Sequence, residues 1–344
     1  MVQYLLGSTY RLFSALTHAG ATVNVYTYEP TDTITVFSMT GATLTSFDGS
    51  KLLAGTLTLQ NAGLASPILP ENKQLLRELN LTGNKLTSFN PAIYPNLVML
   101  NLSGNALTSI DVSGNAWLQL LAASKNAISN ATLNNSILWY VDLSENQLQS
   151  IDLSKAPSLN QLSLAYNQLS SLDLSEQKEL HGLSVVANLF RFSTLPPVLP
   201  QYGVYNYGNQ AQVEVPLQDE KIIDLSSEAM VGDSATTYTW YLGEPVYNYD
   251  TFEWEGETLI EGKEYTVTNG VTTFLKRFND VICRMSNPMF PNLDLFTVYY
   301  DVNQSMGVEN VSSETEPAHK YLRNGMIYID RNGKTYTVMG QTIR

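Results

Sequence analysis

The sequence predicts an elongated all-β protein, with a solenoid of parallel coils, then a β-sandwich, then a small C-terminal β-hairpin segment. Three observations support this. Stretches such as LNLTGNKLTSF and LNLSGNALTSI recur at a nearly constant spacing through the first half of the chain. Short runs rich in Val, Ile, Thr and Tyr, separated by turn residues, follow over 204–303. Two Asn-Gly pairs lie near the end. A period of about twenty residues is typical of a solenoid.

The repeat is marked by an asparagine that returns every 20 or 21 residues, within the frame L-x-x-L-x-L-x-x-N-x-L. Two weaker copies precede these, with Ala42 and Ala62 at the asparagine position. We expect about eight coils over 34–200, after an N-terminal cap at 1–33. The six asparagines are Asn84, Asn105, Asn126, Asn146, Asn167 and Asn188.

The leucines and the asparagine of this frame have different expected tasks. L-x-L is a period-two strand pattern, so its leucines face inward and the intervening positions face outward. One such strand cannot bury its own face, and stacked coils must supply the core together. The asparagine amide offers both donors and an acceptor, so it can satisfy buried backbone groups at the turn. We therefore predict a structural asparagine ladder that does not bind a ligand.

The motif resembles the leucine-rich repeat family, and it covers roughly half of the chain. The resemblance implies one parallel β-strand in each coil of 20–22 residues. It also implies a broad concave face, onto which the outward-facing strand positions project.

Composition excludes several classes of protein. The net charge is −13, and residues 201–344 carry 20 acidic against 10 basic side chains. Binding to nucleic acid needs a basic face, so nucleic acid is not an expected partner. The sequence contains no run of 18 apolar residues, so no membrane span is predicted.

Cys283 is the single cysteine, so no internal disulfide can form. Arg11 interrupts the apolar start of the chain, which is atypical of a signal peptide. Either the protein is cytosolic or the sequence starts after a removed signal peptide, and we favour the second.

Residues 204–303 resemble an immunoglobulin-like sandwich. Trp240 stands where such a domain has its core tryptophan, and Cys283 stands at the second core cysteine. The first cysteine is absent, because Ile223 or Leu225 occupies that strand. The resemblance therefore implies that Cys283 is a buried free thiol that packs as a small apolar side chain.

One segment of this region, 244–257, alternates aromatic and acidic residues. It can be a long hairpin whose aromatic side chains pack on the sandwich or on the solenoid. Aromatic faces beside carboxylates can instead bind a sugar, and clustered carboxylates can hold calcium. The four aromatic residues are Tyr247, Tyr249, Phe252 and Trp254.

The end of the chain is a polar linker at 304–320 followed by 321–344. Asn324-Gly325 and Asn332-Gly333 are flanked by alternating apolar residues, which predicts two tight turns and three small strands. This tail resembles the C-terminal tails of exported proteins of Bacteroidetes-type bacteria, and the resemblance implies a sorting signal. Short acceptor motifs at Thr33 and Ser234 are similar to those for O-glycans in such bacteria.

The sequence lacks the motifs of an enzyme. His18, His181 and His319 are far apart, and no P-loop, HExxH or G-x-S-x-G pattern is present. We expect no catalysis, no cofactor and no metal.

The predicted concave face carries an apolar stripe. Met99, Leu120 and Tyr140 occupy the same position in three successive coils and together span about 10 Å. Such a stripe can mark an interaction site, or it can reflect neutral drift or the cover of a neighbouring loop. Asn101, Asp142 and Gln161 surround it.

The whole arrangement resembles the internalin-like surface proteins, which implies an extracellular or cell-surface location. We predict a non-enzymatic binding or adhesion protein whose partner is a host or bacterial surface protein. A glycan-binding module that uses residues 247–254 is the alternative. A passive structural surface protein is a third reading.

Overall fold

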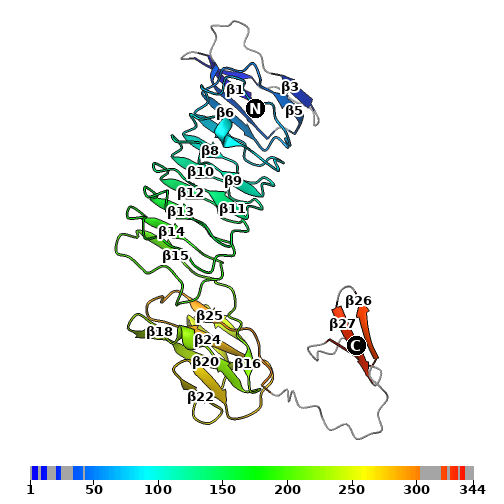
Figure 1. Ribbon diagram of the computed structural model, residues 1–344, viewed down its shortest axis with the longest axis vertical. Coiled ribbons are helices and arrows are strands. Elements are labelled where there is room, and N and C mark those ends of the chain that lie inside the picture. Colours follow the sequence, from blue (N-terminus) through cyan, green and yellow to red (C-terminus); the bar gives the residue numbers. More distant parts are fainter. Residues whose placement is uncertain are drawn as a thin grey trace.

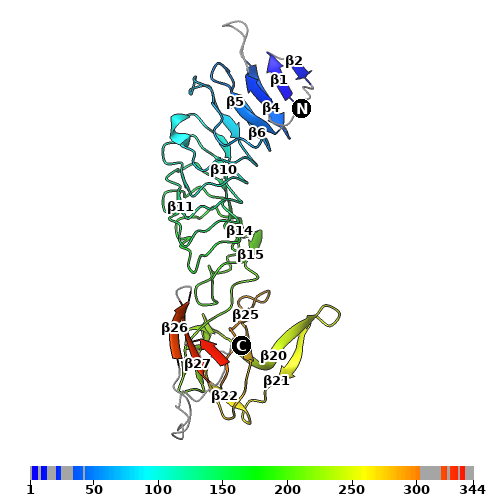
Figure 2. The same ribbon diagram turned by 90° about the vertical axis from the view of Figure 1, so that its right-hand side faces the viewer.

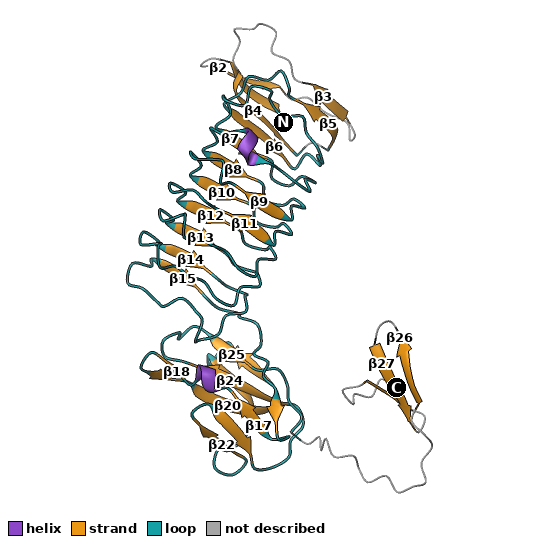
Figure 3. Ribbon diagram, viewed as in Figure 1, coloured by secondary structure: helices purple, strands orange, loops and turns teal. Residues whose placement is uncertain are grey.

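The solenoid is built on one long parallel sheet (Figures 1 and 3). The computed structural model describes residues 2–6, 9–13, 21–24, 34–41, 43–302, 319–323, 326–331 and 334–337. Each coil contributes one short strand, and neighbouring strands pair in parallel with the L-x-L leucines opposite one another. The strands are β4 (Ile34–Thr40), β6 (Thr56–Gln60), β7 (Glu78–Asn80), β8 (Met99–Asn101), β10 (Leu120–Ala122), β12 (Tyr140–Asp142), β13 (Gln161–Ser163), β14 (Gly182–Ser184) and β15 (Val204–Asn206).

The first coil is extended by strands from the predicted cap. β1 (Val2–Leu6) pairs antiparallel with β4, and β2 (Thr9–Phe13) pairs antiparallel with β1. β3 (Ala21–Asn24) runs parallel to β5 (Leu44–Asp48). The antiparallel strands therefore continue the solenoid sheet beyond its first coil. Ala42 and Thr33 lie outside the described residues.

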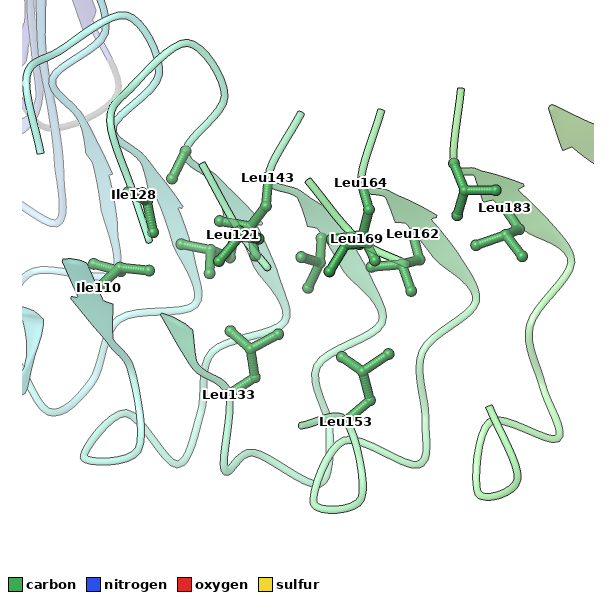
Figure 4. Close-up of a cluster of buried hydrophobic side chains, with 14 of the residues drawn as sticks. Ile110, Leu121, Ile128, Leu133, Leu143, Leu153, Leu162, Leu164, Leu169 and Leu183 are labelled. Atoms are coloured by element: carbon green, nitrogen blue, oxygen red, sulfur yellow. The ribbon is translucent and has the colours of Figure 1, made fainter. Parts of the chain in front are cut away.

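The frame leucines fill the interior of the coils. Leu121, Leu143 and Leu164 are each at most 1% exposed. Figure 4 shows that leucines of successive coils point into the interior, which lies between the sheet strands and the opposite side of the solenoid. Because every coil contributes the same side chains at the same depth, the core is one continuous column. Truncating one of these leucines to alanine typically costs about 2–5 kcal/mol.

The asparagine ladder links each coil to the one before it. In Asn146, the Oδ1 atom accepts a hydrogen bond from the Ile128 N–H at 2.9 Å. Its Nδ2 group donates to the carbonyls of Ala123 and Leu143, both at 3.0 Å. The other five asparagines of the ladder make the corresponding bonds. A single buried amide thus satisfies three backbone groups that the turn between strand and loop would leave without partners.

The residue before each asparagine adopts a left-handed backbone. Gly83 and Gly104 have φ values of 69° and 68°, which glycine adopts at no steric cost. Lys125, Glu145 and Tyr166 have φ values of 53° to 56° at the same place in later coils. A side chain in this conformation costs about 1–2 kcal/mol. The repeat therefore imposes the same turn on coils whose sequence does not favour it.

A second set of buried amides lies on the opposite side of the coils. Near them, β9 (Ser109–Asp111) and β11 (Asn130–Thr132) form a short parallel pair. Asn115 is fully buried and donates to the carbonyls of Pro91 and Tyr94, and Asn135 donates to the Asn115 carbonyl. Pro91 opens the short helix η1 (Pro91–Ile93), which Asn90 caps. The leucine frame does not mark these positions.

The solenoid runs further than the predicted limit at residue 200. β15 pairs in parallel with β14, although the sequence placed residue 204 at the start of the sandwich. Gln210 takes the asparagine position of this coil: its Nε2 donates to Val185 O and Tyr207 O, and its Oε1 accepts from the Asn188 and Phe190 N–H groups. Glutamine is one carbon longer but carries the same amide, so the search for asparagine missed this coil.

A packed junction joins the last coil to the next region. The Phe290 ring stacks on Phe192 with the centroids 6.2 Å apart, and it meets Tyr207 edge-on at 5.3 Å. The buried Glu228 carboxylate accepts hydrogen bonds from Ser193 N and Oγ at 3.0 and 2.7 Å. Aromatic packing and a charge-assisted hydrogen bond thus fix the two regions together.

The next region is antiparallel. One sheet has the order β16-β17-β23-β22 and another has the order β21-β20-β24-β25. β18 and β19 form a two-stranded pair, and η2 (Ser226–Glu228) is a single short turn. The strands are β16 (Leu217–Gln218), β17 (Ile222–Asp224), β18 (Met230–Val231), β19 (Ser234–Ala235), β20 (Thr237–Asn248), β21 (Glu253–Thr258), β22 (Tyr265–Thr268), β23 (Val271–Phe274), β24 (Val281–Ser286) and β25 (Asp294–Phe296).

Trp240 joins these two sheets. It is fully buried, its Nε1 donates to Thr272 Oγ1 at 3.1 Å, and its ring meets Phe274 edge-on at 4.8 Å. Cys283 pairs directly with Trp240 across β20 and β24. The prediction that Cys283 is a buried free thiol is confirmed, and burial raises the pKa of this thiol.

The predicted three C-terminal strands are present. β26 (His319–Arg323), β27 (Met326–Arg331) and β28 (Lys334–Thr337) form an antiparallel sheet. Both Asn-Gly pairs and most of the linker lie outside the described residues. Within the described part of the chain, no helix is long and apolar enough to cross a membrane.

Candidate interaction surface on the solenoid sheet

Strand register brings the predicted binding residues together. Met99, Leu120, Tyr140 and Gln161 are direct neighbours across β8, β10, β12 and β13. Two residues further along the same strands, Asn101, Ala122 and Asp142 form a second row. We call the outward-facing side of the solenoid-sheet strands from β6 to β15, which exclude β9 and β11, the sheet face. The predicted column is thus one contiguous row, and its role in binding stays a prediction.

The sheet face has a hollow of about 340 Å³ beside this row. Met99 is 40% exposed, whereas Leu120 and Tyr140 are partly buried. Tyr140 also lines a second hollow of about 190 Å³ over β13 to β15, where the Gln161 side chain lies over Gly182. Tyr140 therefore stands between the two hollows. The side chains lining the first hollow are those of Thr56, Thr58, Glu78, Asn80, Met99, Asn101, Leu120, Ala122 and Tyr140, and the inward-facing Leu57, Leu79 and Leu100 also border it.

Two carboxylates give the sheet face its charge. Glu78 is exposed and its Oε2 accepts a hydrogen bond from Thr56 Oγ1 at 3.3 Å. Asp142 is partly buried and its Oδ1 accepts from the N–H and Oγ of Ser144 at 3.0 and 2.6 Å. Strands β6 to β15 contain no Lys or Arg, and no ion pair involves either carboxylate within the described residues. Burial, with the nearby Asp142 charge, raises the pKa of Tyr140.

Sequence reasoning missed an aromatic border to this surface. Trp139 is 43% exposed, and its ring meets that of Tyr140 at 6.0 Å and 68°. Trp117 and Ile137, which precede β10 and β12 by three residues, are also exposed. All three stand just before strands, outside the leucine frame. The signal in the sequence was the presence of large apolar residues at positions that the leucine frame does not use for the core. Large apolar side chains gathered on a surface often mark interaction sites.

The aromatic loop of the antiparallel region forms the β20–β21 hairpin, which reaches away from the rest of the region (Figure 2). The structure divides its four aromatic residues. Trp254 packs on Phe296 and Tyr247, and its Nε1 donates to Asp294 Oδ2 at 2.8 Å. Tyr249 and Phe252 are 80% and 75% exposed at the end of the hairpin. The Tyr249 ring also meets Tyr247 edge-on at 5.1 Å. The four residues thus differ in exposure, and their role in glycan binding stays a prediction.

Two further predictions concern modification at Ser234 and metal binding. Ser234 lies in β19 and is partly buried, and its backbone carbonyl accepts from Asn287. The residues that the structure describes contain no group of three or more His, Cys, Asp and Glu side chains arranged to hold a metal ion.

Comparison with known proteins supports the fold. The model of the family described as Leucine Rich Repeat matches residues 75–97. The chain folds as a leucine-rich repeat β-solenoid with coils of about 21 residues, followed by a C-terminal antiparallel β region. No curated protein matches it significantly.

Three solved structures are similar to this chain at low sequence identity. The leucine-rich repeat domain of APL1B is 23% identical, with 48% of this chain and 52% of that one covered and a TM-score of 0.38. An internalin from Listeria monocytogenes is 21% identical, with 51% and 57% covered and a TM-score of 0.34. The functional domain of InlJ, also from Listeria monocytogenes, is 16% identical, with 78% and 85% covered and a TM-score of 0.27. The chain spans little more than half the length of the first two. The similarity concerns the fold.

Proposed function

We propose that this chain is a non-enzymatic binding protein, exported or held at a cell surface, which uses the sheet face of its solenoid to bind another protein. The single observation that carries the proposal is the row of Met99, Leu120 and Tyr140 beside an open hollow. Aromatic side chains at the centre of a contact surface typically dominate its binding energy. Leucine-rich repeat proteins such as internalins typically bind proteins, which agrees with this proposal.

The surface has the composition of a protein-binding site. Around the apolar row most side chains are short and neutral, with Glu78 and Asp142 as the charged exceptions, so the backbone of a partner can approach closely. Trp139 extends the apolar area past the edge of the strands. A partly apolar centre with a polar border is the usual arrangement in interfaces between proteins that also exist separately.

A photo-cross-linking experiment tests this. A benzophenone amino acid replaces Asn101 on the sheet face or, as a matched control, Lys155 on the opposite side of the coil. With a preparation of host or bacterial surface proteins, we expect a discrete cross-linked partner only from position 101. Adding Tyr140→Ala to the position-101 protein should remove that product. Equal products from both positions would contradict the proposal, and no product from either would favour a passive structural role.

A second candidate function is glycan binding by the β20–β21 hairpin. The exposed Tyr249 and Phe252 favour it, and Phe252 has a φ of 58°, which is strained for a bulky residue. A glycan array probed with the parent and with Tyr249→Ala tests this function. Binding that the substitution removes would support it.

We also infer that the antiparallel region is immunoglobulin-like, since Trp240 and Cys283 are direct neighbours on its paired strands. The proposed export is consistent with the internalin likeness and with the tail as a sorting signal. O-glycans at Thr33 and Ser234 remain part of this proposal, and the intact mass of protein from the native host would reveal them.

A further inference from the structure

The arrangement of apolar and charged side chains on the sheet face limits the kind of partner segment that it can bind. Met99 and Leu120 line the hollow together with polar side chains such as Asn101. On the strands to either side, Glu78 on β7 also lines the hollow, whereas Asp142 on β12 lies just outside its lining. Neither carboxylate is joined to a basic side chain within the described residues. A partner segment that covers this hollow therefore contacts Met99 and Leu120, with one carboxylate in the lining and a second one just beyond it.

The distance between the two carboxylates sets a spacing. β7 and β12 are three strand steps apart, and neighbouring parallel strands lie about 4.8 Å apart, so the separation along the solenoid is about 14 Å. An extended chain advances about 3.3 Å per residue, so residues i and i+4 lie about 13 Å apart. Residues i, i+2 and i+4 of such a chain also point to the same side.

We propose that the sheet face recognises an extended segment of a partner protein with a basic–x–apolar–x–basic pattern. The central apolar side chain enters the hollow over Met99 and Leu120, against the Tyr140 ring. The two Lys or Arg side chains reach Glu78 and Asp142. Their long flexible stems span the sideways offset between the two carboxylates, which stand in neighbouring rows of the sheet face. This inference rests on the proposed function and specifies its ligand.

The hydrogen bonds of the two carboxylates allow their charges to be removed without changing the fold. Asn80 and Asn101 occupy the position of Asp142 in earlier coils, and each accepts the same backbone N–H two residues on, at 3.0 Å. Asp142→Asn therefore reproduces a turn that the protein already contains. Glu78→Gln keeps an oxygen that can accept from Thr56 Oγ1. Loss of binding in these variants therefore reports on charge.

The test uses the full chain labelled with ¹⁵N-tryptophan, which gives one indole N–H signal for each of its four tryptophans. Trp139→Phe assigns the Trp139 signal beside Tyr140, and the buried Trp240 is the internal control. The probes are three peptides with blocked termini: KTLTK, the charge-reversed ETLTE, and KTSTK without the apolar centre. Neutral oligosaccharides form a separate series.

We expect KTLTK to shift the Trp139 signal with a dissociation constant below about 1 mM, and to leave Trp240 unchanged. ETLTE and KTSTK should bind at least about tenfold more weakly. Glu78→Gln and Asp142→Asn should each weaken KTLTK about two- to fivefold, and the effect should shrink at high salt. Glu176→Gln, at an exposed position away from the strands, should change nothing.

Equal binding of KTLTK and ETLTE, no binding of KTLTK, or a Trp139 shift caused only by oligosaccharides would each overturn this inference. The proposed function is judged separately, because cross-linking at position 101 uses whole partner proteins. A cross-link there that Tyr140→Ala removes, together with a failure of the peptides, would retain the sheet face as the site and reject the charge pattern.

Discussion

The solenoid and the antiparallel region bury their cores in different ways. In the solenoid, the contact that Asn146 makes with its neighbouring coils is repeated by five other asparagines. In the antiparallel region, the contact of Trp240 with Thr272 and Phe274 occurs once. With a repeated contact, many equivalent positions each contribute part of the free energy of unfolding. With a single contact, one residue contributes a large part of it. The repeat also leaves one face of the sheet free to vary, and the candidate binding residues lie on that face.

The largest expected effect comes from removing the single central contact. Trp240→Ala should destabilise the antiparallel region by about 3–5 kcal/mol, because it leaves a large cavity and removes the donor to Thr272 Oγ1. Chemical denaturation followed by near-ultraviolet circular dichroism measures this. A loss below about 1 kcal/mol would show that the two sheets do not depend on this residue.

Cys283 gives an independent measure of the same core. A thiol reagent should label it at least about a thousandfold more slowly in the native protein than in denaturant, because the buried thiol reacts only after an opening that costs about 4 kcal/mol. The raised pKa of the thiol acts in the same direction, since it lowers the thiolate fraction at neutral pH. Rapid labelling of the native protein would mean that this core opens readily.

The solenoid should respond less strongly to the loss of one ladder position. Asn146→Ala should cost about 1–3 kcal/mol, because it leaves the Ile128 N–H and two carbonyls without partners. Asn130→Ala, at an exposed position in β11, is the matched control and should change the stability by less than about 0.5 kcal/mol. If both variants unfolded at the parent temperature, the ladder would not stabilise the solenoid.

The smallest expected effect is a gain in stability. Glu145 has a φ of 53° at a position where earlier coils have glycine. Glu145→Gly should stabilise the solenoid by up to about 1 kcal/mol, through relief of left-handed strain. Gly104→Ala should destabilise it by at least a similar amount. Equal thermal stabilities for the two variants would show that the turn carries no strain.

The period made much of the solenoid predictable from the sequence. Because each coil repeats, the neighbours of Tyr140 could be inferred without a structure, and strand pairing places Leu120 and Gln161 there. Gln210 was missed because a longer amide replaces the asparagine. Trp139 was missed because it stands one position before the strand.

The antiparallel region has no such period, and its contacts were less predictable. The sequence could not separate Trp254 from Phe252, although both belong to one aromatic run. The partner of Trp254 is Asp294, forty residues away, and only the fold brings them within 2.8 Å. The same limit applies to the Glu228 contact with Ser193, which joins the two regions. Long-range contacts between single side chains leave no repeating pattern in the sequence.

The most direct test of the account compares the two surfaces with one identified partner. Its affinity is measured for the parent and for folded Tyr140→Ala, Met99→Ala, Tyr249→Ala and Lys155→Ala variants. Tyr140→Ala should weaken binding by about 2 kcal/mol or more, and Met99→Ala by less, whereas Tyr249→Ala and Lys155→Ala should leave it unchanged. Unchanged binding by Tyr140→Ala, together with a loss in Tyr249→Ala, would contradict the account and move the site to the β20–β21 hairpin.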